Sequence, residues 1–255
     1  MTFPYNCTVF CEPRERRQFE GVFMKRFIPL GLIGVLILST FIAVSPTAAK
    51  GQSAGLVSSV LNRLEKNRAN LKSLRAGLTM EKYNSQLGTN DKTTGVVSYL
   101  PGAGRNASVR IEWTSPQHEI IAVQNGKYVL FRPRLKTAYT GSSTKGPRPA
   151  NGILDMMYMS RQQLEARFEP LKDVREETIW GGISTIHLTL IPKGNASYKY
   201  AEVWIDASGM PVQSKIVEKN DDSTTMRLSG LEKNIKIPSD EFQIKLDSDV
   251  KVIKS

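Results

Sequence analysis

The sequence predicts a mainly β protein in which helices cover a large antiparallel sheet. Two observations carry this prediction. Downstream of Gly77, short β-prone runs alternate with turn residues, which is typical of hairpin-linked strands. Upstream of Gly77, apolar residues recur at three- and four-residue steps, which indicates an amphipathic helix.

The N-terminal 49 residues are interpreted as a leader and not as part of the fold. Met24 begins a short basic stretch, Lys25 and Arg26, followed by an apolar run from Phe27 to Val44. Small residues at Thr47 and Ala49 then fit a signal peptidase site, so we expect a signal peptide over 24–49, cleaved after Ala49. Because residues 1–23 precede this start, we interpret them as a mis-called start. An uncleaved membrane anchor is the alternative.

The expected mature chain, residues 50–255, opens with the helix. Leu56, Val60, Leu61 and Leu64 begin an apolar stripe that continues through Leu71 and Leu74, which predicts a helix over about 54–75.

Strands are expected on both sides of a middle segment. Asn125-Gly126 is a strong hairpin signal, and Ser208-Gly209 and Asn220-Asp221 are further turns. With five or six strands on each side, a large antiparallel sheet follows. The expected strands are 78–84, 94–100, 107–113, 119–124, 127–132, 178–180, 183–191, 198–206, 212–219 and 223–231.

The middle segment has a different composition. A loop rich in Gly, Pro, Ser and Lys (141–152) leads into Met156, Met157 and Met159. Ser160 and Gln163 have capping-box spacing, which predicts a second helix over 160–168. Methionine is flexible and polarizable, so the cluster is suited to a site that accepts several apolar shapes; a helix packed on the sheet explains it equally well.

Composition limits the kinds of partner and of chemistry. The chain carries 35 Lys and Arg against 24 Asp and Glu, a net charge of +11; residues 1–49 hold five of the basic and three of the acidic residues, so the mature chain keeps +9. Both cysteines, Cys7 and Cys11, also fall in that leader, which excludes a disulfide framework. The positive charge favours anionic surfaces, whereas no aromatic-basic platform for nucleic acid is present.

Several short motifs follow one another in a distinctive order. A strand is expected to end at Pro101, an Arg-x-x-Trp strand (Arg110 to Trp113) and Pro116 follow, and a hairpin is expected at Asn125-Gly126-Lys127. Further motifs downstream are Leu188 to Lys193, Val203 to Asp206 and Ile237 to Phe242. In this order the motifs resemble the LolA family of outer-membrane lipoprotein carriers. The resemblance covers about 54–252, and the motifs are more specific together than singly.

The resemblance implies an incompletely closed, strongly curved antiparallel half-barrel, covered by helices around an apolar cavity for acyl chains. Strand alternation agrees, because apolar Val109, Ile111 and Trp113 alternate with Arg110 and Glu112. The cavity lining is expected to include Val109, Ile111, Trp113, Ile121, Val123, Phe131, Met156, Met157, Met159, Leu164, Phe168, Ile186, Leu188, Leu190, Val203 and Ile205.

One residue departs from the family pattern. Many carriers have, just before the strand-ending Pro, an Arg linked to control of the lid and of cargo release, whereas this chain has Leu100 before Pro101. Arg105 or Arg110 is the expected substitute for lid control.

The sequence offers no catalytic or metal constellation, so we expect neither enzyme activity nor a cofactor. Gly51 to Gly55 fits a nucleophile elbow but lacks a preceding strand, and Gly102 to Ala107 fits a dinucleotide fingerprint but precedes a strand rather than a helix. His118 and His187 have no second ligand at zinc spacing; we expect both to be solvated or hydrogen-bonded, His187 on the outward face of its strand.

The expected function is therefore that of a periplasmic, monomeric carrier of lipoproteins or other acylated cargo. The resemblance implies an inner-membrane donor complex and an outer-membrane acceptor as partners, with no role for nucleic acid. The alternative is a sensor module that binds partner proteins on the same fold; a secreted enzyme is a more remote one.

Overall fold

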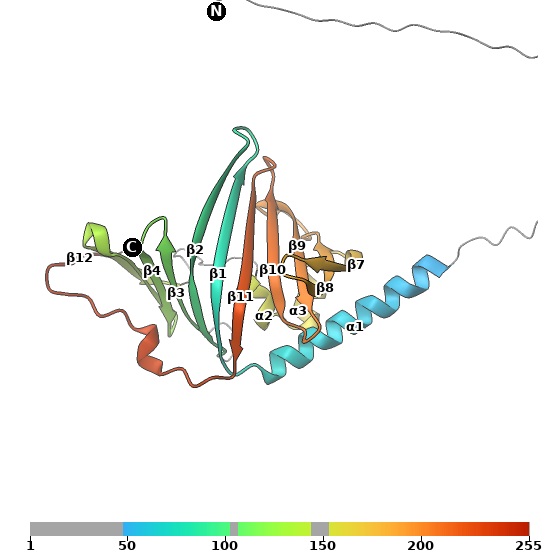
Figure 1. The fold of residues 1–255 in the computed structure, drawn as a ribbon, viewed down its shortest axis with the longest axis horizontal. Coiled ribbons are helices and arrows are strands. Elements are labelled where there is room, and N and C mark those ends of the chain that lie inside the picture. Colours follow the sequence, from blue (N-terminus) through green and yellow to red (C-terminus); the bar gives the residue numbers. More distant parts are fainter. Residues whose placement is uncertain (1–47, 103–106, 144–152, 255) are drawn as a thin grey trace, which may run out of the picture. The chain divides into compact units, whose positions relative to one another are not determined.

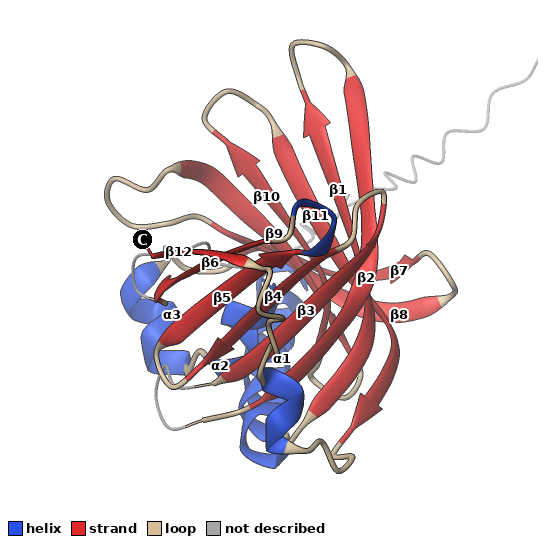
Figure 2. Ribbon diagram, turned by 90° about the vertical axis from the view of Figure 1, so that its left-hand side faces the viewer, coloured by secondary structure: helices blue, strands red, loops and turns tan. Residues whose placement is uncertain are grey.

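The computed structural model describes residues 48–102, 107–143 and 153–254. Residues 1–47, which hold most of the expected signal peptide, and Arg105 lie outside these ranges. Twelve strands form a single sheet with the order β12-β6-β5-β4-β3-β2-β1-β11-β10-β9-β8-β7. All neighbouring pairs are antiparallel except β12 with β6, and the sheet is open and curved, with helices gathered on one side of it (Figures 1 and 2). The predicted half-barrel fold is confirmed.

The strands agree closely with the sequence pattern in the middle of each half. They are β1 Leu74–Asn84, β2 Thr89–Leu100, β3 Ser108–Ser115, β4 Glu119–Gln124, β5 Lys127–Arg132, β6 Thr137–Ser142, β7 Lys172–Ile179, β8 Ile183–Leu190, β9 Tyr198–Asp206, β10 Pro211–Glu218, β11 Ser223–Lys233 and β12 Lys251–Lys254. Sequence analysis missed β6, β12 and most of β7. These three lie at or beside the sheet edges, where polar residues such as Lys172 and Thr137 weaken the apolar alternation.

The tight turns have the backbone conformation that their residues predicted. Asn125 and Gly126 have φ values of 51° and 72°, so both central residues of the β4–β5 turn are left-handed, as a type I′ turn requires. Gly209 and Asp221 also have positive φ, at 82° and 69°.

Three α-helices accompany the sheet within the described ranges: α1 Ala48–Asn70, α2 Ile153–Tyr158 and α3 Arg161–Arg167. The capping box before α3 is present, with Gln163 N–H donating to Ser160 Oγ at 3.2 Å and Ser160 N–H donating to Gln163 Oε1 at 3.0 Å. Two short 3₁₀ turns, η1 Pro133–Leu135 and η2 Ser239–Phe242, complete the elements.

The expected extension of the first helix to residue 75 is wrong. The helix ends at Asn70, and β1 begins at Leu74. The connection is held by long-range bonds: Lys72 N–H donates to Asn234 Oδ1 at 2.7 Å, and Ser73 Oγ–H donates to Ile235 O at 2.5 Å. Leu71 and Leu74 continued the helical spacing by coincidence, since Leu74 belongs to the period-two pattern of β1.

The core lies on the concave face, between the sheet and the helices. Cross-strand partners such as Val97 and Ile111, or Leu78 and Leu228, point to this face and are almost fully buried. Ile153, Leu154 and Met157 of α2 pack against the central strands. Val60, Leu61 and Leu64 of α1 pack with Leu164 of α3 against β8 and β9.

Helix α1 is tied to the β9–β10 turn at one point. The Asn67 Nδ2 group lies 3.6 Å from Met210 Sδ, as a weak buried hydrogen bond. Gly209, in the same turn, approaches the helix so closely that an added methyl group would lie 2.1 Å from the carbonyl oxygen of Arg63. The turn therefore needs glycine for its φ and also for the packing of α1.

We predict that Gly209→Ala destabilises the protein far more than Gly181→Ala. Both glycines have φ near 80°, at 82° and 86°, but a methyl group at Gly181 meets nothing within 4 Å. Both variants have the same backbone strain, so the difference between their free energies of unfolding reports the overpacking against α1. We expect this difference to be about 1–3 kcal/mol. Urea unfolding followed by circular dichroism measures both; equal losses of stability would mean that α1 does not rest on this turn.

Candidate functional site

A cavity opens on the concave face, between the sheet and the α2–α3 segment. Its volume is about 790 Å³, within the range of about 300–1,000 Å³ that is common for ligand sites. It is lined by Met80, Lys82, Met156, Met159, Ala166, Arg167, Phe168, Leu190, Pro192, Lys193, Ser197, Tyr198, Ala201, Val203, Ser214, Ile216, Glu218, Thr224 and Met226.

Strand register builds the floor of this cavity from two rows of directly opposed residues. The inner row crosses β9, β10, β11 and β1 as Val203, Ser214, Met226 and Met80. The next row crosses from β8 to β1 as Leu190, Ala201, Ile216, Thr224 and Lys82. Both rows are apolar on the β8–β9 side, and the second ends in polar side chains on β11 and β1.

Methionines form the apolar surface on both sides of the cavity. Met156 and Met159 come from the helical segment, whereas Met80 and Met226 face them from the sheet. Phe168, directly after α3, adds an aromatic side chain. Because methionine adapts its shape to irregular apolar partners, this lining can accept chains of differing length and branching.

The structure divides the residues expected to line the cavity into groups. Met156, Met159, Phe168, Leu190 and Val203 line it. Leu164, Ile186, Leu188 and Ile205 are buried beside it, in the core under α1 and α3. A third group belongs to the core under α2 or to the strands next to it: Val109, Ile111, Trp113, Ile121, Val123 and Met157.

Sequence analysis missed the contributions of β1, β10 and β11, above all Met80, Met226 and Ile216. The signal was available, because Met80 continues the alternation of Ala76 and Leu78, and Met226 that of Leu228. To identify these residues as cavity lining, however, one must know the strand register that pairs Met80 with Met226.

Phe131 and Arg110 lie on the opposite, convex face. Phe131 pairs with Ile120, one residue out of phase with the inward-facing Ile121, and it lines a shallow groove beside Pro238 and Ile244. Arg110 lines the same groove. Strand alternation directs both side chains away from the helices, so Phe131 does not line the cavity on the concave face. Lid control by Arg110 stays a prediction.

Arg110 instead helps to hold the chain segment after β11 against the sheet. Its Nη1 donates to the Glu241 carbonyl oxygen at 3.3 Å, and its Nη2 donates to Glu112 at 3.0 Å. The Glu241 carboxylate accepts hydrogen bonds from Arg75 at 2.6 Å and from Ser98 Oγ at 2.5 Å. Partial burial raises the pKa of Glu241, but these bonds and the charges of Arg75 and Arg110 outweigh it and hold that pKa below its usual value.

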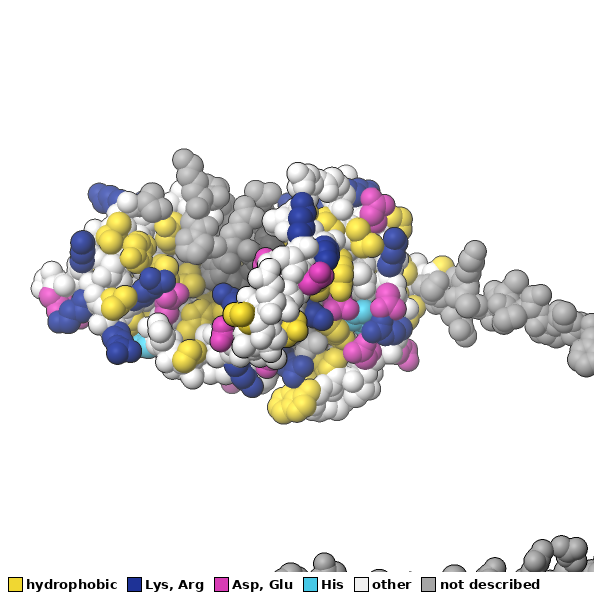
Figure 3. All heavy atoms as spheres, turned by 90° about the horizontal axis from the view of Figure 1, so that it is seen from above, with side chains coloured by type: hydrophobic (Ala, Val, Ile, Leu, Met, Phe, Trp, Pro, Cys, Tyr) yellow, Lys and Arg dark blue, Asp and Glu magenta, His cyan; other side chains and the backbone are white. Residues whose placement is uncertain are grey.

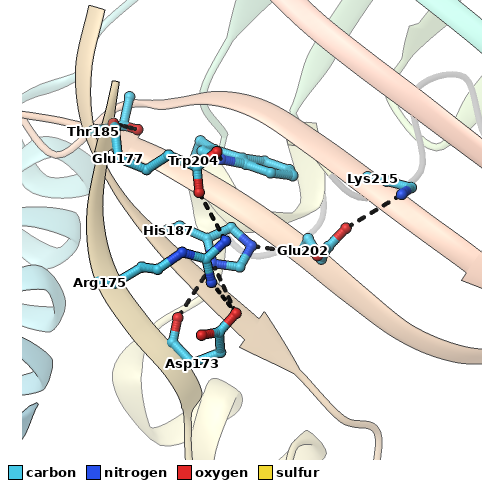
Figure 4. A network of polar contacts seen from close by, with 8 residues as sticks. All are labelled: Asp173, Arg175, Glu177, Thr185, His187, Glu202, Trp204 and Lys215. Carbon is cyan, nitrogen blue, oxygen red and sulfur yellow. Dashed lines mark hydrogen bonds and ion pairs between the residues drawn. The ribbon is translucent and has the colours of Figure 1, made fainter. Parts of the chain in front are cut away.

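A second polar network surrounds His187 on the convex face (Figure 4). His187 points outward, as expected, yet it is fully buried. Its ring lies 4.7 Å from that of Trp204, its Nδ1 lies 3.2 Å from the Asp173 carbonyl oxygen, and its Nε2 is 3.5 Å from Glu202 Oε1. Arg175 bonds both Asp173 and Glu177, so that the outer surface over His187 is closed by ion pairs.

His118 is the other histidine, and it is exposed. Its Nε2 lies 3.0 Å from Glu112 Oε1. Within the described ranges, no group of three or more His, Cys, Asp or Glu side chains is arranged to hold a metal ion. Ser53, in the sequence that fits a nucleophile elbow, falls within α1 and does not follow a strand.

On one face of the molecule, positive and negative side chains are mixed. Figure 3 shows Lys and Arg side chains interspersed with Asp and Glu across the face seen from above.

Within residues 48–102, 107–143 and 153–254, no helix combines the length and the apolar character needed to cross a membrane.

Comparison with known proteins places this fold in a family. The sequence matches the family described as outer membrane lipoprotein carrier protein LolA over residues 81–245, which is more than half of the chain. The chain belongs to the LolA family. Among curated proteins, none matches it.

Solved structures that resemble this chain have low sequence identity to it. An uncharacterized conserved protein from Thermus thermophilus is 12% identical, with a TM-score of 0.50 over 78% of this chain and 99% of that one. The MucA/MucB complex of Pseudomonas aeruginosa is 15% identical, with a TM-score of 0.47 over 77% of this chain. The match spans only 62% of that MucA/MucB chain, which is less than two thirds of its length. LprF from Mycobacterium bovis is 12% identical, with a TM-score of 0.43 over 71% of this chain and 97% of that one.

We predict that Glu241→Gln destabilises the protein at neutral pH and that the loss disappears in acid. The folded-state pKa of Glu241 is lowered, so its carboxylate stabilises the fold above the unfolded value of about 4.3, and that contribution is lost as the pH falls through the folded pKa. Urea unfolding across this pH range measures the effect.

Asp240→Asn is the matched control, because it removes the neighbouring charge from the same 3₁₀ turn. Among the described residues, no cation pairs with the Asp240 side chain. If Asp240→Asn reproduced the pH-dependent loss, the effect would come from net charge and not from the contact of Glu241 with Arg75 and Ser98.

Proposed function

We propose that this protein is a carrier that shields acyl chains in the cavity on its concave face. The observation that carries the proposal is the cavity of about 790 Å³, whose lining includes four methionines together with leucine, valine and phenylalanine side chains. Its membership of the LolA family, whose description is that of a lipoprotein carrier, supports the same function. Lipoproteins or other acylated molecules are the proposed cargo.

The energetics of acyl binding fit a reversible carrier. Burial of a methylene group contributes about 0.8 kcal/mol, so about ten methylenes would contribute roughly 8 kcal/mol. That value corresponds to a dissociation constant of about 1 μM before the cost of association is subtracted. A carrier that buries enough methylenes to exceed this cost holds its cargo in transit and can still release it to an acceptor that buries the chains more completely.

A carrier function also gives a purpose to the leader interpreted from residues 24–49. Export to the periplasm would place the protein between a donor at the inner membrane and an acceptor at the outer membrane. No catalytic group is needed for this transfer, because both steps exchange one apolar environment for another.

We predict that Ala166→Trp weakens the binding of a fluorescent acyl probe. Ala166 lies on α3, is exposed and lines the cavity, so an indole there occupies space without disturbing the core. Displacing two or three methylenes would cost roughly 2 kcal/mol, or about thirtyfold in the dissociation constant. Fluorescence titration of the purified mature protein, residues 50–255, measures this.

Gln162→Trp is the matched control, because Gln162 is exposed on the same helix but does not line the cavity. It should bind the probe as the unchanged protein does. If the unchanged protein took up no acyl probe, the carrier function would be excluded, and a protein-binding regulatory module on the same fold would take its place.

A further inference from the structure

The mouth of the cavity differs in chemistry from its interior. The lining contains three cations, Lys82, Arg167 and Lys193, against the single carboxylate of Glu218. Hydroxyl groups of Ser197 and Thr224 are also at its surface. A purely apolar cargo would gain nothing from these groups.

Strand register fixes where the polar groups lie. Along the row from Leu190 to Lys82, the side chains change from apolar on β8 to a hydroxyl at Thr224 and a cation at Lys82. Toward the hairpin ends of the same strands, Glu218 pairs with Tyr198, and both line the cavity. Apart from Ser214, the lining is therefore apolar at its base, and it is polar toward the β1–β2 and β10–β11 hairpins, which Figure 1 shows extending beyond the rest of the sheet.

Two of the cations are held beside each other by the backbone. Lys193 N–H donates to the Arg167 carbonyl oxygen at 2.8 Å, and Glu169 N–H donates to the Ile191 carbonyl oxygen at 2.8 Å, which fastens the end of α3 to the end of β8. Lys193 Nζ donates to the Glu165 carbonyl oxygen at 2.7 Å. The backbone thus keeps two like charges together on one wall, while Lys82 projects from the other side of the row.

Among the described residues, these cations have no carboxylate paired with them. Arg75, Arg132 and Lys199, elsewhere on the sheet, each pair with a carboxylate. By contrast, no carboxylate oxygen of the described residues lies within 4.0 Å of the side-chain nitrogens of Lys82, Arg167 or Lys193. Like charges gathered at a cavity mouth without a partner are suited to an anion that arrives with the ligand.

We propose that the cavity selects amphiphiles with an anionic headgroup, a carboxylate or phosphate attached to the acyl chain. This inference rests on the proposed carrier function and names the chemistry of its cargo. The chain lies on the methionine-rich base, and the headgroup is bound by Arg167 and Lys193 on one side and by Lys82 on the other. Arg167 can bind two headgroup oxygens at once, as guanidinium groups do with phosphate and carboxylate.

The test compares a fluorescent long-chain fatty acid with the uncharged methyl ester of the same chain, at neutral pH and low ionic strength. The unchanged protein should bind the acid roughly tenfold more tightly, as expected for one charge-assisted contact. The variants Lys82→Ala, Arg167→Ala and the triple variant with Lys193→Ala should progressively lose that preference while binding the ester as before. Retained ester binding shows that each variant is folded.

Lys219→Ala is the matched control, since Lys219 is an exposed lysine next to Glu218 that bonds Asn195 and does not line the cavity. It should keep the preference for the acid. Equal binding of acid and ester by the unchanged protein would overturn the inference but leave the carrier function intact, whereas binding of neither would overturn both. If inorganic phosphate alone bound to these cations while acid and ester bound equally, the mouth would be a site for a free anion and the inference would also fail.

Discussion

The concave face of an open sheet has to be covered, and the rest of this structure depends on that constraint. Paired strands place apolar side chains such as Leu78, Ile111 and Val203 on one face of a single twelve-stranded sheet. A closed barrel would bury that face against itself, whereas an open sheet leaves it in need of other partners. The helices cover it, but between α2, α3 and strands β8 to β11 the cover is incomplete, and this gap is the cavity.

Incomplete cover explains why the cavity wall is built as it is. Where α2 covers the sheet tightly, the side chains on both sides of the contact are large and fully buried, as with Tyr99 on β2 and Ile153 on α2. Where it is loose, methionines from both layers face the space. A flexible thioether loses less packing energy than a branched side chain when its neighbour is absent, because it can move to fill part of the void. The cavity can therefore exist empty or filled.

On the convex face, many side chains form hydrogen bonds and ion pairs. Because this face is polar, it does not have to be covered by a second apolar layer. Glu241 binds Arg75 and Ser98 and so attaches the chain after β11 across the sheet. Around His187, ion pairs of Arg175 with Asp173 and Glu177 close the outer surface. Such contacts contribute little net stability at a surface, but they give most of these polar groups a partner. Among the described residues the exception is His187 Nε2, which is buried without a hydrogen bond.

The sequence by itself determined the turns, most strand centres and the second helix, because these depend on local chemistry: left-handed residues at Asn125-Gly126, a capping box at Ser160 and Gln163, and apolar alternation. It also determined the LolA family through the order of its motifs. Prediction from local spacing failed at Leu71 and Leu74, where the helical spacing and the strand spacing coincide. It also failed at the polar edge strands. Only the tertiary structure decided which apolar residues meet at the cavity. Register pairs Met80 with Met226, far apart in sequence, and turns Phe131 to the other face. A shift of one residue in the pairing would move each of these side chains to the other face of the sheet. The pairing of distant strands therefore had to be known before the residues of the cavity could be identified.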